Sequence, residues 1–401
     1  MKYDMVFEGG GAKGIVFVGA MEVFESLGHK PGRLLGTSAG AITATMLAAG
    51  YNSKEMLDAL AEKKEGHSVF AEFLGIPQDF DKAAIQNSAT RALLRRINVP
   101  WIPDAIEDKL DDHLVEWLAT QPSLRHVFSF LERGGWYAAD SFLAWLRRRL
   151  DTGINNGKPR HYSNLTLLQF HEETKVDLSL VASDTTGNEM LVLNHRTAPD
   201  LPLVWTVRMS MSVPLLWQEV IWQAEWGQYR GSELTGHAIV DGGLLSNFPI
   251  ELFVSHDATV TSVMGSKSLE NVLGMLIDES LPVSGVDAAS PQPTGFDLTK
   301  LQTVQRLQNL VNTATSAHDK MTVEAFEKLV VHLPAKGYGT TEFDMPDAKR
   351  NLLVNAGREA MKAYFEGAAP REMVSFGVTQ DRDADRAQRH ADKLALKMLK
   401  R

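Results

Sequence analysis

Two short apolar runs near the amino terminus each end at a glycine-containing turn and lead into a helical pattern. Met5-Val6-Phe7 ends at Gly9-Gly10-Gly11, and the apolar residues from Ile15 to Leu27 then follow helical spacing. The second run, Leu34-Leu35, leads through a turn into the Ala- and Met-rich stretch 39–49. Strands that alternate with helices in this way form parallel sheets with helices on both faces. This part of the chain is therefore predicted to have an α/β fold.

The pattern changes further along the 401 residues. Residues 53–150 show helical patterns without a convincing strand, which indicates a helical insertion. A helical pattern is expected from Asp297 to Phe326, after a stretch rich in Pro, Ser and Gly at 282–295 that is typical of a linker. Residues 379–401 are expected to form a basic, solvated terminal helix. Between these parts, strands are predicted at Asp177–Ala182, Met190–Asn194, Val220–Trp222, His237–Val240 and Thr259–Val263.

Composition excludes several classes of protein. Hydrophobic residues make up 44% and charged residues 23%, which is ordinary globular usage and rules out wholesale disorder. The net charge of −9 disfavours nucleic acid as a partner, and the absence of cysteine excludes disulfides, thiolate metal sites and cysteine nucleophiles. Asp4 and Glu8 interrupt the first apolar run, so it makes a poor signal peptide, and no uncharged apolar stretch reaches about 18 residues. The expected location is the cytoplasm.

A glycine-rich segment, Gly9-Gly10-Gly11-Ala12-Lys13-Gly14, follows the first strand and opens the first helix. Backbone amides at a helix start can bind an anion. A dinucleotide site would need an acidic residue roughly 20 positions further on, and a phosphate-binding P-loop would need Ser or Thr after the lysine. Where the dinucleotide site would need its acidic residue, the chain has Gly36-Thr37-Ser38. Where the P-loop would need Ser or Thr, directly after Lys13, the chain has Gly14. Both nucleotide interpretations therefore fail in detail. A glycine turn without a ligand is the remaining alternative.

The segment Gly36-Thr37-Ser38-Ala39-Gly40 lies between a predicted strand and a predicted helix. This G-x-S-x-G pattern is typical of a nucleophile elbow, in which glycines at positions −2 and +2 allow a sharp turn that presents the serine hydroxyl. The positive end of the following helix favours negative charge that develops at the serine. Ser38 is therefore a candidate nucleophile.

Acyl transfer also needs amide donors for the oxyanion and a base for the serine. Adjacent parallel strands end side by side, so the amides of the glycine-rich segment are expected near Ser38, with Ala39 as a further donor. Asp241-Gly242-Gly243 places a carboxylate at the end of an apolar strand. By itself Asp-Gly-Gly is more often a turn, but in this context Asp241 is a candidate base.

Together and in this order, the glycine-rich segment, G-T-S-A-G and D-G-G resemble the patatin-like phospholipase family. The small-residue stretch Arg208–Pro214 and the run from Asp241 through Asn247-Phe248-Pro249 resemble it as well, so that the likeness spans about Tyr3 to His256. The resemblance implies a three-layer α/β/α fold with a mainly parallel sheet and a Ser–Asp dyad without a catalytic histidine. It assigns Ser38 as nucleophile, Asp241 as base and Gly9–Gly14 as the oxyanion loop.

The resemblance divides the chain into a catalytic domain at 3–256, with the insertion near 53–150, and a mostly helical region at 257–401. Ser38 and Asp241 are 203 positions apart, more than in compact patatins, and the insertion accounts for the difference. The expected function is a serine acyl hydrolase that cleaves fatty-acyl esters of phospholipids or related lipids, with peripheral contact to a membrane and without a cofactor or metal. The sequence gives no oligomeric state.

Two other functions remain open. One is a histidine-assisted esterase on small soluble esters, since His256, His318, His332 and His390 follow Asp241, although each is interpreted as an ordinary histidine. The other is a nucleotide-binding regulatory module that uses the Gly9–Gly14 loop.

Several side chains have two interpretations. Lys13 is expected in solvent, with a phosphate headgroup as the alternative partner. The tryptophans Trp217, Trp222 and Trp226 are expected in the core, with an acyl-chain channel as the alternative. For the apolar side chains of the insertion, an interfacial lid and a buried helical subdomain are equally favoured. The tail from Arg382 to Arg401 offers a basic patch for membrane contact. The apolar side chains in question are Phe70, Phe73, Trp101 and Ile102.

Overall fold

The computed structural model describes residues 1–64, 66–95, 104–266, 271–286, 325–367 and 382–399, together with Val323. Its centre is an eight-stranded sheet. The strands are β1 (Lys2–Phe7), β2 (Lys30–Thr37), β8 (Leu178–Asp184), β9 (Glu189–Leu193), β11 (Val220–Ile221), β12 (Ala238–Asp241), β13 (Val272–Pro282) and β14 (Val330–Lys336).

The sheet is mainly parallel, as the sequence predicted. Its order is β11-β12-β8-β2-β1-β13-β14, and β9 also pairs with β8. The parallel pairs are β1–β2, β1–β13, β13–β14 and β2–β8. Antiparallel pairs join β12 to β11, and β8 to both β12 and β9. The antiparallel strands therefore gather at one side of an otherwise parallel sheet.

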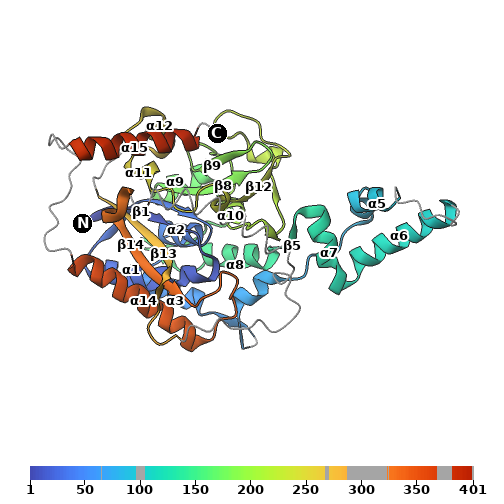
Figure 1. Ribbon diagram of the computed structural model, residues 1–401, viewed down its shortest axis with the longest axis horizontal. Helices are drawn as coiled ribbons and strands as arrows, with labels where there is room; N and C mark the ends of the chain where they lie inside the picture. The colour runs from blue at the N-terminus through green and yellow to red at the C-terminus, as the bar shows by residue number, and fades with distance from the viewer. Residues whose placement is uncertain are drawn as a thin grey trace.

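Helices cover both faces of the sheet, which gives three layers (Figure 1). Met5 and Phe7 of β1 belong to the apolar core on one face, and Val6 belongs to the core on the other. This follows from the alternation of side chains along a strand. The first face is covered by α1 (Val16–Ser26), α2 (Ala39–Ala48), α10 (Leu203–Ser210) and α14 (Asp347–Glu366), and the second by α11 (Glu251–Val254), α12 (Ala258–Met264) and α15 (Arg382–Leu399).

The region 53–150 is largely helical, and part of it projects from the body of the molecule as an arm formed by α5, α6 and α7 (Figure 1). The arm has a small core of its own, made of Phe80, Val115, Ala119 and Phe128. Short strands that the sequence did not reveal are β3 (Lys63–Lys64), β4 (His67–Ser68) and β5 (Gly135–Tyr137), which pairs with β10 (Leu215–Trp217). The helices are α3 (Ser53–Leu60), α4 (Lys82–Gln86), α5 (Ala89–Leu94), α6 (Asp104–Thr120), α7 (Pro122–Arg133) and α8 (Asp140–Leu150).

The remaining short elements connect these parts. Among the described helices, none combines the length and the apolar composition needed to cross a bilayer. The connecting elements are β6 (Ile154–Asn155), β7 (Lys158–Pro159), α9 (Leu167–Thr174) and the 3₁₀ turns η1 (Gly11–Ile15), η2 (Val69–Leu74), η3 (Ala224–Trp226), η4 (Gly242–Leu244) and η6 (Glu327–Leu329).

One predicted strand is wrong. Thr259–Val263 lies inside helix α12, although its β-branched residues favour a strand. The Asp257 side chain accepts a hydrogen bond from Thr259 N at 2.7 Å and caps the helix. Val260, Val263 and Met264 are buried at the spacing i, i+3, i+4, so packing against one helical face outweighs the local preference.

Two strands beyond residue 256 were missed in the sequence. β13 begins with a continuously apolar stretch, and such runs have no periodicity that separates a buried strand from a helix. β14 contains Pro334, which argues against a central strand, but β14 ends the order of the sheet, where proline is tolerated. The strands β13 and β14 extend the same sheet that β1 and β2 begin.

The carboxy-terminal helix is confirmed as α15, but its expected exposure to solvent is wrong on one face. Ala391, Ala395, Met398 and Leu399 are buried against the core that contains Val6. The four side chains recur at helical spacing and form one apolar face. Asp392 lies beside this face and accepts hydrogen bonds from the Ser255 hydroxyl and from His256 N. The helix expected at 297–326 lies outside the described residues except at its end, and so does the 282–295 linker beyond residue 286.

Candidate active site

Ser38 is the single residue between the end of β2 and the start of α2. Its backbone has φ 53° and ψ −119°, a conformation that non-glycine residues rarely adopt. A side chain at Gly36 would collide with the carbonyl of Gly40, and one at Gly40 would collide with the carbonyl of Phe7. The two glycines therefore allow the tight turn, and the strand–turn–helix geometry predicted around Ser38 is present.

Ser210, at the end of α10, holds this turn in place. Its hydroxyl accepts a hydrogen bond from Ser38 N at 3.1 Å and donates one to the carbonyl of Val181 in β8 at 2.6 Å. Ser210 is fully buried, so the bridge is shielded from water. In the sequence, the segment around Ser210 stands out only for its small residues, which do not reveal this contact.

Asp241 meets the Ser38 turn because β2 and β12 approach each other end to end along β8. Leu180 and Val181 pair with both β2 and β9, so these strands occupy opposite edges of β8. Ala182–Asp184 pair with both β9 and β12, which places β12 on the edge used by β2. Thr37 lies opposite Val181, and Asp241 lies opposite Ala182, the next residue. The last residues of the two strands therefore converge.

The Asp241 carboxyl lies in a desolvated environment. It is 3% exposed, and its Oδ1 accepts a hydrogen bond from Gly243 N at 2.7 Å. Burial raises the pKa of Asp241 to about 7, and the nearby Ser38 hydroxyl and Gly243 amide oppose the rise. Asp241 Oδ2 is buried and has no hydrogen bond of normal geometry within the described residues. Gly242 packs against the backbone of Val181, which fixes the turn after the aspartate.

The glycine-rich segment lies against the Ser38 turn. A Cβ at Gly9 would be 2.9 Å from Ser38 Cβ, and one at Gly14 would be 2.7 Å from Ala39 Cβ. Gly11 has φ +56°, which favours glycine. The segment can therefore approach the serine only because its residues are small.

The amides of this segment differ in what they can bind. Gly9 N donates to the carbonyl of Asn247 at 3.3 Å, and Ala12 N donates to the carbonyl of Thr340 at 2.9 Å. In the described part of the chain, no hydrogen bond occupies the amides of Gly10, Gly11 or Ala39. Of the expected oxyanion donors, Gly10, Gly11 and Ala39 thus have free amides, and Gly9 and Ala12 do not.

Hydrogen bonds of Asn247 and Glu8 fix the position of the glycine-rich segment. Asn247 Nδ2 donates to the carbonyl of Gly9 at 2.9 Å and to Glu8 Oε1 at 3.1 Å. Glu8 Oε2 accepts a hydrogen bond from Ile277 N in β13 at 2.6 Å. Asn247 was noted in the sequence only as part of the resemblance, and Glu8 only as a charge near the amino terminus.

An apolar pocket of about 350 Å³ opens at Ser38. Phe70 and Phe73 of η2 line it, and their rings pack edge to face at 4.9 Å. Trp217 also lines the pocket, which supports the acyl-channel alternative for this residue alone. Trp222 and Trp226 are buried in the core, as expected. Trp101 and Ile102 lie outside the described residues.

A further part of the pocket lining comes from residues 340–350, which run from the end of β14 into α14 and were not predicted from the sequence to lie at the site. Thr340, Phe343 and Arg350 line the pocket here. The Arg350 guanidinium is 2.9 Å from Asp347 Oδ1, while its Nε is buried without a hydrogen bond in the described part of the structure. The pocket therefore combines apolar walls with the cationic Arg350 and with Glu342, whose carboxylate forms an ion pair with Lys349.

Lys13 is not exposed to solvent, so that expectation is wrong. It is 2% exposed and forms an ion pair with Glu279 of β13. The η1 turn directs Lys13 toward the sheet, where a buried ammonium group requires a partner. Lys13 does not line the pocket at Ser38.

No histidine lines the pocket within the described residues. His332 lies between Asp278 and Glu327, with nitrogen–oxygen distances of 2.9 Å and 3.2 Å. The backbone of His256 donates to Asp392 at 2.8 Å. His318 and the side chain of His390 lie outside the described residues. A histidine-assisted mechanism therefore finds no support in this pocket.

Comparison with known proteins defines the class. Residues 5–254 match the family described as patatin-like phospholipase, and this segment is more than half of the chain. The chain belongs to the patatin-like phospholipase family. It is 27% identical over 374 residues to the uncharacterized protein YqhO of Bacillus subtilis (strain 168), and the match covers 91% of this chain and 99% of YqhO.

Solved structures of low sequence identity are also similar. VipD from Legionella pneumophila is 17% identical with a TM-score of 0.44, and the match covers 91% of this chain and 67% of VipD. ExoU in its complex with SpcU, from the type III secretion system of Pseudomonas aeruginosa, is 17% identical with a TM-score of 0.31. That match covers 91% of this chain but 51% of the solved chain, so this protein spans about half of that relative.

Proposed function

We propose that this protein is a serine acyl hydrolase that cleaves fatty-acyl esters of phospholipids or related lipids, with Ser38 as nucleophile and Asp241 as base. The observation that carries the proposal is the convergence of β2 and β12 along β8, which brings the buried Asp241 carboxyl close to the Ser38 turn, and Ser38 lines an apolar pocket. Membership in the patatin-like phospholipase family supports an ester of a lipid as the substrate.

The reaction proceeds through an acyl-enzyme. Asp241 accepts the proton of the Ser38 hydroxyl while Oγ attacks the ester carbonyl carbon. The tetrahedral oxyanion accepts hydrogen bonds from the free amides of Gly10, Gly11 and Ala39, and the carbon–oxygen bond to the alcohol breaks. Asp241 returns the proton to the leaving alkoxide. Water then attacks the acyl-enzyme with Asp241 as base, and the fatty acid leaves as the proton returns to Ser38.

The base strength of Asp241 fits this task. An ordinary aspartate has a pKa near 4 and is a weak base for a hydroxyl, whereas a pKa of about 7 brings it close to neutral working conditions. Much of the barrier reduction must still come from the oxyanion donors, where a single donor contributes about 3–4 kcal/mol. Because α2 begins at Ala39, its positive end adds to the stabilisation.

The walls of the pocket support a substrate with an acyl chain and an anionic group. Phe70, Phe73 and Trp217 offer an apolar channel for the chain. The Arg350 side chain, which also lines the pocket, offers a guanidinium group that suits a phosphate oxygen of the headgroup. Loss of the Arg350 guanidinium would then weaken the binding of phospholipid more than that of an uncharged ester.

Peripheral contact with a lipid surface belongs to the proposal. The arm carries exposed apolar side chains, among them Leu93 at 62%, Trp117 at 52% and Leu131 at 54% exposure. Figure 1 shows that α5, α6 and α7 extend away from the body, where they can reach a surface without contact from other elements. Apolar groups of this kind insert into the headgroup region of a bilayer.

An active-site probe tests the proposed nucleophile. A fluorophosphonate should label the wild-type protein at Ser38, identified by peptide mass spectrometry, and should not label Ser38→Ala. Incubation with a total lipid extract should then release fatty acids from one lipid class. Labelling at another serine, or equal fatty-acid release by Ser38→Ala, would refute the proposal.

A further inference from the structure

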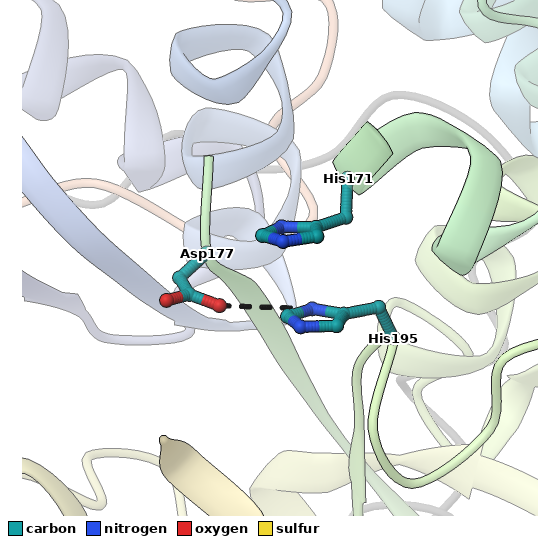
Figure 2. A group of neighbouring side chains, drawn as sticks. All are labelled: His171, Asp177 and His195. Carbon is teal, nitrogen blue, oxygen red and sulfur yellow. Dashed lines mark ion pairs between the residues drawn. The ribbon is translucent and has the colours of Figure 1, made fainter. Parts of the chain in front are cut away.

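A second cluster of chemically active side chains lies at the amino-terminal end of β8, opposite the end that meets Asp241. It consists of His171 in α9, Asp177 just before β8, and His195 just after β9. Figure 2 shows the two imidazole rings stacked, with Asp177 at their edge. Their centroids are 3.6 Å apart with an angle of 5° between the planes. One potential ligand atom from each residue lies within 4.8 Å of the others.

The hydrogen bond made by His171 fixes which of its nitrogens can bind a ligand. His171 Nδ1 is 3.0 Å from the carbonyl oxygen of Val176. Because a carbonyl oxygen can only accept, Nδ1 carries the proton and the Nε2 lone pair of the neutral ring stays available. Metal-ligating histidines usually show this arrangement, in which a carbonyl orients the ring through its other nitrogen.

Asp177 supplies an oxygen ligand that the protein leaves incompletely bonded. Its Oδ1 is buried and forms no hydrogen bond of normal geometry in the described part of the chain. The same oxygen is 3.6 Å from His195 Nδ1 and 2.7 Å from Arg196 Nη2. The Arg196 charge thus occupies the place beside the carboxylate that a metal cation would take.

We propose that His171, Asp177 and His195 form a binding site for a divalent transition metal of the zinc type. Two imidazoles and one carboxylate are ligands typical of Zn²⁺, whereas Mg²⁺ and Ca²⁺ prefer oxygen alone. Zn²⁺ with ligands at about 2.0–2.1 Å requires the ligand atoms to lie about 3.3 Å apart. Atoms that now lie within 4.8 Å of one another must therefore approach by up to about 1.5 Å. The rings must tilt from their parallel stack, water completes the tetrahedron, and Arg196 moves away.

The site would join three elements rather than act on substrate. α9, β8 and the turn after β9 each contribute one ligand, and this end of β8 is remote from Ser38 along the strand. A bound ion would therefore stabilise this junction of the fold. Hydrolysis at Ser38 would proceed without it, so the inference and the proposed function can fail independently.

Zinc titration of the metal-free full-length protein tests the site. Isothermal titration with ZnSO₄ should show one ion per chain, and the melting temperature should rise. His195→Ala and Asp177→Asn should each weaken binding by about 100-fold or more, since even the loss of groups that only orient metal ligands costs 10–100-fold. His67→Ala is the matched control, because His67 also pairs with an aspartate, Asp344, but belongs to no metal-type cluster among the described residues.

Arg196→Gln gives a result that a structural role of the cluster would not produce. Removal of the competing guanidinium should strengthen zinc binding by at least several-fold, whereas the other variants weaken it. Circular dichroism checks that each variant is folded. The visible spectrum of bound Co²⁺ should report tetrahedral coordination in wild type and should be altered or lost in Asp177→Asn. Absence of saturable zinc binding to wild type, or zinc binding unchanged in His195→Ala and Asp177→Asn, would overturn the proposal.

Discussion

Ser38 combines a proposed chemical role with a strained backbone. At φ 53° a side chain costs free energy that glycine does not, of order 1 kcal/mol. Ser38→Gly should therefore raise the melting temperature by a few degrees while it abolishes ester hydrolysis, with a loss of at least about 10⁴-fold. Ser38→Ala should abolish hydrolysis to the same extent without the gain in stability. Thermal unfolding and turnover of a soluble ester measure both effects, and substantial turnover in either variant would refute the assignment.

Asp241 should make activity and stability change with pH in opposite directions. With a pKa of about 7, the base becomes active as pH rises through neutrality, so turnover should increase with a midpoint near pH 7. In the unfolded chain the Asp241 carboxyl has a pKa near 3.9. Between about pH 3.9 and 7 the folded protein therefore keeps a proton on Asp241 that the unfolded chain has lost. The free energy of unfolding should therefore fall across this range, by up to about 4 kcal/mol in total.

Asp241→Asn isolates this effect. The amide cannot accept the proton, so turnover should fall nearly as far as in Ser38→Ala. Because the variant lacks the buried ionisable group, its stability relative to wild type should increase as pH rises from about 4 to 7. Denaturant unfolding at several pH values provides the measurement. If the two proteins lose stability in parallel over this range, the elevated pKa of Asp241 is wrong.

The elements around the site set its geometry, and Asn247 links two of them. Its side chain fixes the glycine-rich segment that follows β1, and its carbonyl accepts from Gly9 N. Asn247→Ala should misplace the free amides of Gly10 and Gly11. We expect kcat to fall by about 10²–10³-fold with little change in KM, because oxyanion donors act mainly in the transition state.

Asn271→Ala is the control for this variant. Asn271 lies just before β13 and its side chain donates to the carbonyl of Lys2 at 3.4 Å, away from the pocket. Hydrolysis by Asn271→Ala should match wild type. An equal rise in KM and fall in kcat for Asn247→Ala, or loss of its circular dichroism signal, would indicate that Asn247 only supports the fold.

The whole molecule is expected to respond to lipid surfaces through its arm. If Trp117, Leu93 and Leu131 enter a bilayer or micelle, activity on a short-chain phospholipid should rise sharply above the micelle concentration. Trp117→Ala should weaken that rise several-fold and leave hydrolysis of a monomeric ester unchanged, because Trp117 does not line the pocket. Ile154→Ala, which removes another exposed apolar side chain from a region outside the arm, is the control. A simple saturation curve through the micelle concentration would contradict the role of the arm.

Local signals in the sequence were sufficient for the α/β class and for Ser38 and Asp241 as candidates. Glycines two positions before and after Ser38 predict a tight turn, and an apolar run before Asp241 predicts the end of a strand. The turn and the strand end can be predicted because each depends on neighbouring residues. Local patterns gave the wrong result at Thr259–Val263, where capping and burial stabilise a helix. They also failed at β13, because its uniformly apolar run has no hydrophobic periodicity that would distinguish a strand from a helix.

Contacts between distant residues were decided only in the tertiary structure. The approach of β12 to β2 depends on their shared edge of β8, and the support of Gly9 by Asn247 joins residues 238 positions apart. The pocket wall at Thr340–Arg350 and the stack of His171 on His195 arise in the same way. Turn and helix preferences act over a few residues and can be read along the chain. Strand pairing and burial depend on the whole chain, so they appear only after it has folded.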